Sequence, residues 1–236
     1  MKTKLYHCLL VAICLFAACK KDDQAKKNTT PASTQITDSV SYTINGKNYV
    51  LTLHDGGDYG TSPCNLVYDP VTGRTSKDAD SIMFFKEYSF KSNRQNRNDT
   101  VFVAAISFFR KYSSKSLITA HEPFYPVDQS AMYAPGNHTV ATDFIRTFST
   151  NGVAIYVARV GRTYSYRFAN QPTTVTQAQQ ANSSFVVTSL KPIDDQTYWL
   201  EAKFNVTLFN DDTEEPIVLK NGYVRMKIQY APFPTN

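Results

Sequence analysis

The segment YWLEAKFNVTL, residues 198–208, decides how this chain folds. Apolar and aromatic side chains occupy every second position from Tyr198 onward, and polar residues such as Glu201 and Lys203 lie between them. Successive side chains of a strand point to opposite faces, so this pattern predicts an antiparallel strand with one buried and one solvated face.

The same alternation returns near the C-terminus. Val224, Met226 and Ile228 share one face, and Arg225 and Lys227 take the other. This pattern predicts a second half-buried strand. The turn-forming stretches between the two segments are 210–213 and 221–222.

A hairpin is predicted at the other end of the folded part. Residues 40–44 and 49–53 are rich in β-formers and flank Asn45-Gly46. Asn-Gly is favoured in two-residue hairpin turns, because both turn residues need a positive φ angle.

The middle of the chain also reads as strands. The expected strands are 81–88, 100–112, 139–149, 153–159 and 164–168. Adjacent apolar pairs such as Phe84-Phe85 and Phe108-Phe109 indicate strands covered on both faces. Residues 54–80 and 113–137 are rich in turn formers and are expected to be long irregular connections with at most a short helix. The chain is therefore predicted to be all-β, an antiparallel β-sandwich or barrel-like fold.

The N-terminus has the layout of a secretory signal. Lys2 and Lys4 precede an uncharged, mainly apolar run that ends in small residues before Cys19. We expect a signal peptide over 1–18, a lipidated cysteine with a flexible polar tether over 19–38, and one β-rich domain over 39–236. An ordinary secretory signal with an incidental cysteine is the alternative.

The ending Leu15-Phe16-Ala17-Ala18-Cys19 resembles the lipobox of bacterial lipoproteins. The charged run at 20–24, the hairpin at 41–47 and the strand patterns of the last third resemble small, largely uncharacterised envelope lipoproteins of the Bacteroidetes. The resemblance implies lipid on Cys19, anchoring in the outer membrane with the surface preferred over the periplasmic face, and a β-rich fold. It implies no reaction.

The composition and the absence of known motifs limit which partners and reactions are expected. The formal net charge of +5 includes Lys2 and Lys4 of the signal, so the mature chain is only mildly basic, and no nucleic-acid partner is expected. No phosphate loop, dinucleotide motif or nucleophile elbow is present. His54, His121 and His138 lack zinc-site spacing. We expect no cofactor, no metal and no catalytic residue.

Five aromatic residues are candidates for binding. Trp199 and Tyr223 fall on the polar faces of their strands, and Phe124, Tyr125 and Tyr133 lie in the proline-bearing stretch. Outward aromatic rings stack on sugars or pack on partners, and recognition residues often lie on loops. The alternative is that the proline-bearing stretch folds over the sheet and buries its rings.

Ser39, Ser81 and Thr100 each follow an aspartate and precede an aliphatic residue. These triplets resemble the acceptor of Bacteroidetes O-glycosylation. An Asp-Ser or Asp-Thr turn before a strand accounts for them equally well.

Taken together, these features predict a non-catalytic envelope lipoprotein. Its partners are expected to be the membrane, through Cys19, and a glycan, a peptide or a neighbouring envelope protein. A structural component of the cell surface is the alternative, followed by an enzyme that acts on polysaccharide.

Overall fold

The structure, a computed structural model, describes residues 38–53, 58–63, 67–69, 74–76, 81–91, 103–113, 117–118, 125–126, 128–144, 150–165 and 175–229. They all belong to one compact unit, Thr37–Asn236. Within these ranges, no helix combines the length and the apolar content needed to cross a bilayer.

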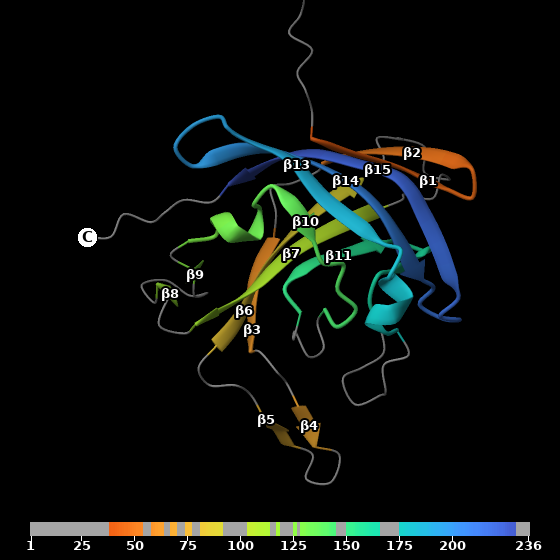
Figure 1. Cartoon of the computed structure of the whole chain (residues 1–236), viewed down its shortest axis with the longest axis horizontal. Coiled ribbons are helices and arrows are strands. Elements are labelled where there is room, and N and C mark those ends of the chain that lie inside the picture. Colours follow the sequence, from red (N-terminus) through yellow and green to blue (C-terminus); the bar gives the residue numbers. More distant parts are fainter. Residues whose placement is uncertain are drawn as a thin grey trace, which may run out of the picture. The chain divides into compact units, whose positions relative to one another are not determined.

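Eight antiparallel strands close into a barrel (Figure 1). Around the barrel they are β14 (Thr197–Phe209), β12 (Gly161–Arg162), β11 (Gly152–Val157), β7 (Val103–Ser113), β6 (Ser81–Lys91), β2 (Lys47–Leu53), β1 (Ser39–Ile44) and β15 (Pro216–Gln229), which pairs with β14 again. The all-β prediction is confirmed in its barrel-like form, because the β14–β15 pairing turns the sheet into a ring.

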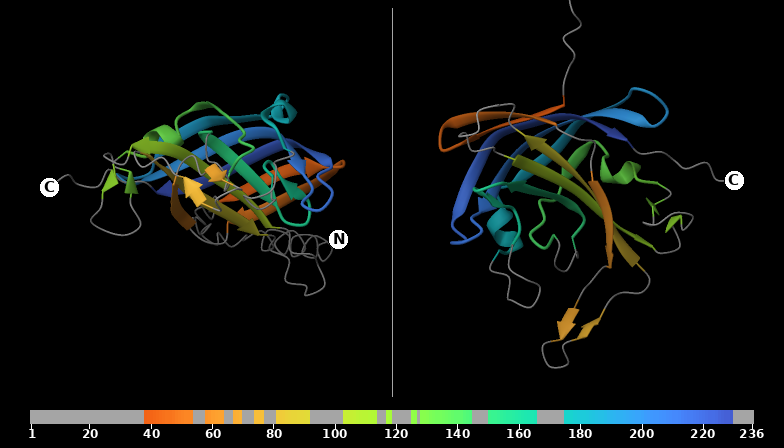
Figure 2. Two further views of the ribbon diagram at one scale, coloured as in Figure 1. Left: turned by 90° about the horizontal axis from the view of Figure 1, so that it is seen from below. Right: turned by 180° about the vertical axis from the view of Figure 1, so that it is seen from behind.

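In the part of the chain that the structure describes, further strands and two short helices extend this ring (Figure 2). β13 (Ser184–Pro192) pairs with β14, β10 (Gly136–His138) with β13, and β3 (Asp58–Pro63) with β6. Two small hairpins join β4 (Val67–Asp69) to β5 (Arg74–Ser76) and β8 (Leu117–Ile118) to β9 (Tyr125–Pro126). The helices are single 3₁₀ turns, η2 (Ser130–Met132) and η3 (Gln177–Gln180).

The predicted N-terminal hairpin is confirmed. β1 and β2 pair in register on either side of Asn45-Gly46. Asn45 has φ 50° and Gly46 has φ 76°, so both turn residues adopt the left-handed conformation that this tight turn requires.

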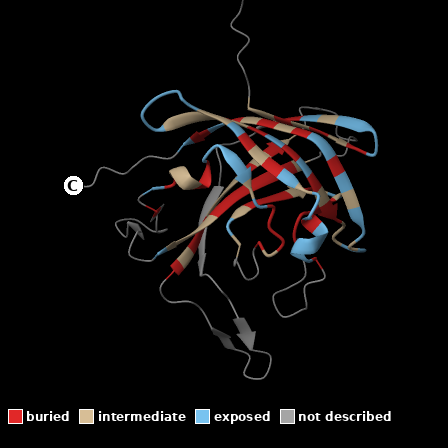
Figure 3. Cartoon of the chain, in the orientation of Figure 1, coloured by how far each residue is buried: buried red, intermediate tan, exposed pale blue. Residues whose placement is uncertain are grey.

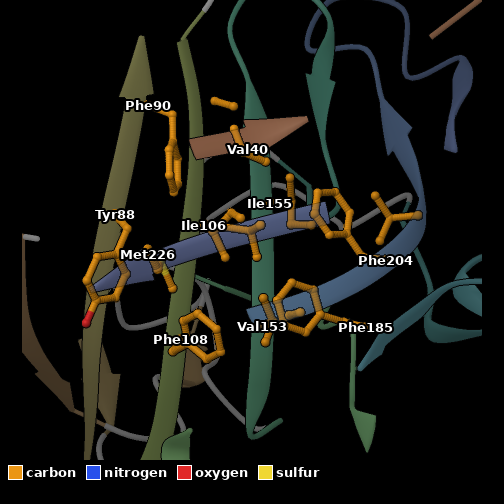
Figure 4. Close-up of a cluster of buried hydrophobic side chains, with 14 of the residues drawn as sticks. Val40, Tyr88, Phe90, Ile106, Phe108, Val153, Ile155, Phe185, Phe204 and Met226 are labelled. Atoms are coloured by element: carbon orange, nitrogen blue, oxygen red, sulfur yellow. The ribbon is translucent and has the colours of Figure 1, made fainter. Parts of the chain in front are cut away.

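The barrel interior is filled by the apolar faces of its strands. On β14 the inward side chains, from Leu200 to Leu208 at every second position, are at most 2% exposed, and buried and exposed bands alternate along the strands in Figure 3. Aromatic rings from several strands meet inside: Phe185 stacks on Phe204, and Phe108 lies edge-on to Phe185 (Figure 4). This confirms the alternation predicted from the sequence.

β6 and β7 are apolar on both faces, as predicted from their adjacent phenylalanines. Phe84 and Phe108 belong to the main core inside the barrel. Phe109 belongs to a second, smaller cluster, and Phe85 packs against it. Phe144, from the segment between β10 and β11, completes this cluster with a ring centroid 4.9 Å from that of Phe109.

Three sequence expectations about irregular and extended segments are wrong. Part of the expected connection 54–80 is strand, since β3 pairs along β6 and β4 pairs with β5. In the expected strand 139–149, the described residues 139–144 form only a single bridge, Val140 to Val153, because the segment packs over the outside of the barrel. The strand expected at 164–168 is not found in its described part, because residues 164–165 follow the two-residue strand β12 and are not themselves in a strand.

The turn expected at Asn221-Gly222 is also wrong. Both residues lie inside β15, where the register with β14 shifts between Phe204 and Val206. Asn221 has φ 52°, and its backbone N–H donates to Asn205 Oδ1 at 2.9 Å. The pair is therefore a β-bulge within a long strand, whereas residues 210–213 form the real turn between β14 and β15.

The strand pairing around the ring is shortest where β12 meets β14. Arg162 and Phe209 are the one residue pair of this ladder. The buried side chain of Gln180 lies across the seam and donates from Nε2 to Thr163 O at 2.9 Å and to Thr207 O at 2.8 Å. A side-chain amide thus replaces missing backbone pairing between the two strands.

Candidate functional site

The outward side of β14 and β15 gathers aromatic and charged side chains. We call this surface the Trp199 face; it comprises Trp199, Glu201, Lys203, Tyr223, Arg225 and Lys227. The register places Trp199 opposite Lys227 and Lys203 opposite Tyr223. Since directly opposed and diagonal side chains of an antiparallel pair touch, these six residues form one continuous surface.

Two cations lie against the Trp199 ring. The guanidinium carbon of Arg225 is 4.7 Å from the ring centroid, and Lys227 Nζ is 5.3 Å from it. Each cation–π contact of this kind contributes about 0.5–1 kcal/mol at an exposed site. These contacts hold an aromatic ring and two positive charges side by side on the barrel surface.

The charge of the face is positive. Lys203, Arg225 and Lys227 face the single carboxylate of Glu201, whose Oε1 is 3.7 Å from Arg225 Nε. On the neighbouring strand β13, Lys191 is opposite Trp199 and is exposed. The surface therefore attracts anionic ligands, and the attraction weakens as salt is added.

A second carboxylate lies at the end of this surface. Asp38 Oδ1 accepts a hydrogen bond of 2.8 Å from the backbone N–H of Lys227. Burial raises the pKa of the Asp38 carboxyl, while this hydrogen bond and the charges of Lys227 and Arg225 oppose the rise. Asp38 thus acts as a local cap where β1 begins beside β15.

Tyr223 has an altered acidity that reflects the same surroundings. Burial raises the pKa of its phenol, and the nearby carboxylate of Glu201 raises it further. A hydrogen bond between the phenol and the Glu201 carboxylate adds to the rise, whereas the charge of Arg225 opposes it. The hydroxyl proton is therefore directed to Glu201, and the ring of Tyr223 is the part that can contact a ligand.

Trp199 and Tyr223 are the two predicted binding residues that the structure brings onto one surface. Tyr223 precedes Lys227, the partner of Trp199, by four residues, or about 13 Å along the strand. Arg225 and Lys227 were not among the predicted binding residues, because the alternation of their strand indicates only a solvated face for them. Their positions one residue to either side of Met226, on a strand that alternates like that of Trp199, were the available signal.

The other aromatic candidates do not join this surface. Tyr133 has 0% exposure and packs inside the barrel, where its hydroxyl lies 3.1 Å from that of Tyr88. Its prediction as a binding residue is corrected: the stretch folds over the strands and buries the ring, which was the alternative. Phe124 lies outside the described residues, and of Tyr125 the structure describes only the backbone in β9.

The predicted modification sites differ in how far they are exposed and in whether the structure describes them. Ser39 begins β1 and is half-buried, and its glycosylation stays a prediction. Ser81 begins β6 and is 6% exposed, which does not fit modification of the folded domain. Thr100 and Cys19, the residue predicted to be lipidated, lie outside the described residues.

Acidic side chains form no ion site in the described ranges. No group of three or more His, Cys, Asp or Glu residues there is arranged to hold a metal ion. In the acidic hairpin tip between β14 and β15, Asp211 instead accepts two hydrogen bonds of 2.6 Å from Arg162. This ion pair ties the tip to β12, next to the single residue pair that joins β12 to β14.

Comparisons with known proteins add no further constraint. No protein-family model, no curated protein and no solved structure matches the chain.

Proposed function

We propose that this protein is a lipid-anchored outer-membrane protein that binds acidic glycans through its Trp199 face. The observation that carries the proposal is the packing of Trp199 against Arg225 and Lys227 on an outward barrel surface. The anchor rests on the lipobox-like segment that ends at Cys19.

The chemistry of the face suits a ligand with both apolar and anionic groups. Sugar rings carry C–H groups that pack on an indole ring, and an Arg guanidinium pairs with carboxylate or phosphate oxygens. A neutral glycan uses only the rings, whereas a uronic-acid or sulfated glycan uses the rings and the cations together. The separation of Trp199 from Tyr223 favours an extended chain over a single sugar.

Titration with polygalacturonate tests the proposal, with neutral dextran as the comparison ligand. Trp199 is the only tryptophan, so fluorescence excited selectively at tryptophan reports on this face, and calorimetry gives the affinity. We expect polygalacturonate to bind and to release as salt is raised. Equal binding of dextran, or binding that is insensitive to salt, contradicts the acidic-glycan proposal.

A matched pair of variants locates the site. Lys227 Nζ lies 5.3 Å from the Trp199 ring, and Lys47 Nζ lies 5.3 Å from the Tyr49 ring on another strand. Lys227→Gln should weaken polygalacturonate binding by about 2- to 5-fold, as expected for an exposed charge contact, and Lys47→Gln should leave it unchanged. An equal loss in both variants would mean that only net charge matters.

The anchor has a separate test. Cys19→Ser should abolish incorporation of labelled palmitate and release the protein from membranes, while the barrel remains folded, because the residue lies outside the domain predicted to start at residue 39. Labelling equal to that of the wild type would refute the anchor.

One observation favours an assembly role as a second candidate. β13 pairs with β14 along its length, but with β10 only at residues 185–187. In the described part of the chain, residues 188–192 thus have a partner strand on one edge only, and such an edge accepts an added strand. Sedimentation at increasing protein concentration tests this role: self-association supports it, and a monomer at all concentrations argues against it.

A further inference from the structure

A hollow of about 250 Å³ lies away from the Trp199 face. It is bounded by the end of β7, by η2 and the segment after it, by β10, and by the start of β11. Phe109, Met132 and Pro135 supply apolar lining, and Arg110, His138 and Asn151 supply polar lining. None of its lining residues belongs to β14 or β15.

Arg110 brings a charge that has no partner in the described residues. The side chain is half-buried and forms no hydrogen bond or ion pair there. Asp128 is near enough for the Arg110 charge to help lower its pKa, although the main cause is the hydrogen bonding of that carboxylate to Ser130. A half-buried guanidinium with unused N–H groups favours an oxyanion ligand.

His138 is held in one orientation at the same hollow. Its Nε2 lies 2.8 Å from Ala134 O, and its ring meets Phe108 and Phe185 edge-on at 83°. A carbonyl oxygen only accepts hydrogen bonds, so Nε2 carries the proton of this bond. Nδ1 makes no hydrogen bond with a described residue and is left for a ligand.

Asn151 adds a further donor. Its Oδ1 accepts a hydrogen bond of 2.7 Å from the backbone N–H of Lys111, which leaves the Nδ2 amino group as its remaining polar atom. The neighbouring Gly152 allows the backbone of Thr139 to approach this wall closely, because a Cβ at position 152 would lie 2.0 Å from Thr139 O. The wall is also pinned by the 2.9 Å hydrogen bond from Val153 N to Thr139 O.

We infer that this hollow binds a single sugar acid. The carboxylate pairs with the Arg110 guanidinium, sugar hydroxyl groups bond to His138 Nδ1 and Asn151 Nδ2, and the ring C–H groups pack on the exposed Pro135. Pockets for drug-sized ligands occupy about 300–1,000 Å³, so a hollow of 250 Å³ suits a smaller molecule of this kind. The inference does not depend on the Trp199 face.

Calorimetry with D-galacturonate tests the inference, with D-galactose as the ligand that lacks only the carboxylate. We expect saturable binding of galacturonate and at least tenfold weaker binding of galactose. Equal affinities for the two sugars, or no binding at millimolar galacturonate, overturn the proposal. The Trp199 fluorescence should not change with the monosaccharide, which separates this result from that of the polygalacturonate titration.

Three variants locate the site. Arg110→Gln should lower the galacturonate affinity at least tenfold, and Asn151→Asp should also lower it, since the aspartate still accepts from Lys111 N but repels a carboxylate. Lys203→Gln, on the Trp199 face, makes the same charge change as Arg110→Gln and should have no effect. Unchanged affinity in Arg110→Gln, with a melting temperature equal to that of the wild type, overturns the proposal.

The source of the sugar acid is decided by a third ligand. A galacturonate oligomer that binds with one copy per hollow, and with the affinity of the monomer, indicates the end of an acidic glycan chain. If the monomer binds and the oligomer does not, the ligand is the free sugar acid.

Discussion

Replacing Gly222 by alanine tests whether close packing explains this glycine in the middle of β15. A Cβ at this position would lie 2.4 Å from two carbon atoms of the Phe204 ring and 2.6 Å from a third. The ring is 2% exposed and stacks on Phe185 with centroids 5.6 Å apart and an interplanar angle of 19°. Phe204 therefore has no free space into which it can retreat.

The loss of stability expected for Gly222→Ala follows from these distances. Carbon atoms in optimal contact are about 3.5–4.0 Å apart, so the added methyl group must displace the ring by roughly 1 Å or more. Overpacking of a core by one methylene-sized group costs about 1–3 kcal/mol. For a domain of this size each kcal/mol lowers the melting temperature by about 2–4 °C, so Gly222→Ala should lower it by roughly 2–12 °C.

Urea unfolding followed by Trp199 fluorescence measures the effect, and Phe204→Leu supplies the second background. Leucine removes the ring atoms that the new Cβ would meet. The cost of Gly222→Ala should therefore fall by about 1 kcal/mol or more in the Phe204→Leu protein, a coupling typical of residues in direct contact.

A turn at Asn221-Gly222 makes a different prediction. In that case alanine would be disfavoured by a positive φ angle at Gly222, and its cost would not depend on Phe204. Equal costs in both backgrounds, or a neutral Gly222→Ala, would refute the packing argument.

Three further predictions concern the hairpin, the buried hydroxyls and pH. Replacing Asn45-Gly46 by two β-branched residues should destabilise the domain by about 1–3 kcal/mol, because both positions have positive φ; an unchanged melting temperature would count against this turn. Tyr42→Phe should be neutral or stabilising, since its buried hydroxyl has no hydrogen-bond partner in the described residues, whereas Tyr88→Phe removes a buried hydrogen bond and should cost about 1–2 kcal/mol in urea unfolding. The reverse order of these two variants would be inconsistent with the structure. Burial raises the pKa of the Asp38 carboxyl, so the folded state holds this proton more tightly and stability falls as pH rises through the window above the ordinary value of 3.8. Asp38→Asn, whose amide oxygen can accept the same hydrogen bond, should therefore gain stability over the wild type near pH 7 and lose that gain in acid; an equal difference at both pH values would exclude this linkage.

Features that depend on a short stretch of chain were predictable. The alternation from Leu200 to Leu208 names the inward side chains of β14 without reference to any other strand. Asn45-Gly46 specifies its turn because the φ angles belong to those two residues. Phe84-Phe85 indicates two covered faces, since neighbouring side chains in a strand must point opposite ways.

Features that depend on distant partners could not be predicted from the sequence. β3 is a strand because β6 offers it an unpaired edge, and its own residues, DYGTSP, carry no strand pattern. Gly222 pairs with Phe204 and lies against its ring, and the Asn-Gly pair by itself cannot reveal that contact. In the same way, Tyr133 is buried because Tyr88 and Phe108 meet it inside the barrel.

The candidate site likewise combines features set by a single strand with features set by contacts between distant segments. The outward position of Trp199 follows from the period of its own strand, whereas its contacts with Arg225 and Lys227 require the register between β14 and β15. The hollow beside His138 requires segments from four elements to meet, and no local pattern marks it. Side-chain direction along a strand is set by backbone geometry that every residue shares, but register and enclosure are set by which distant surfaces fit together when the barrel closes.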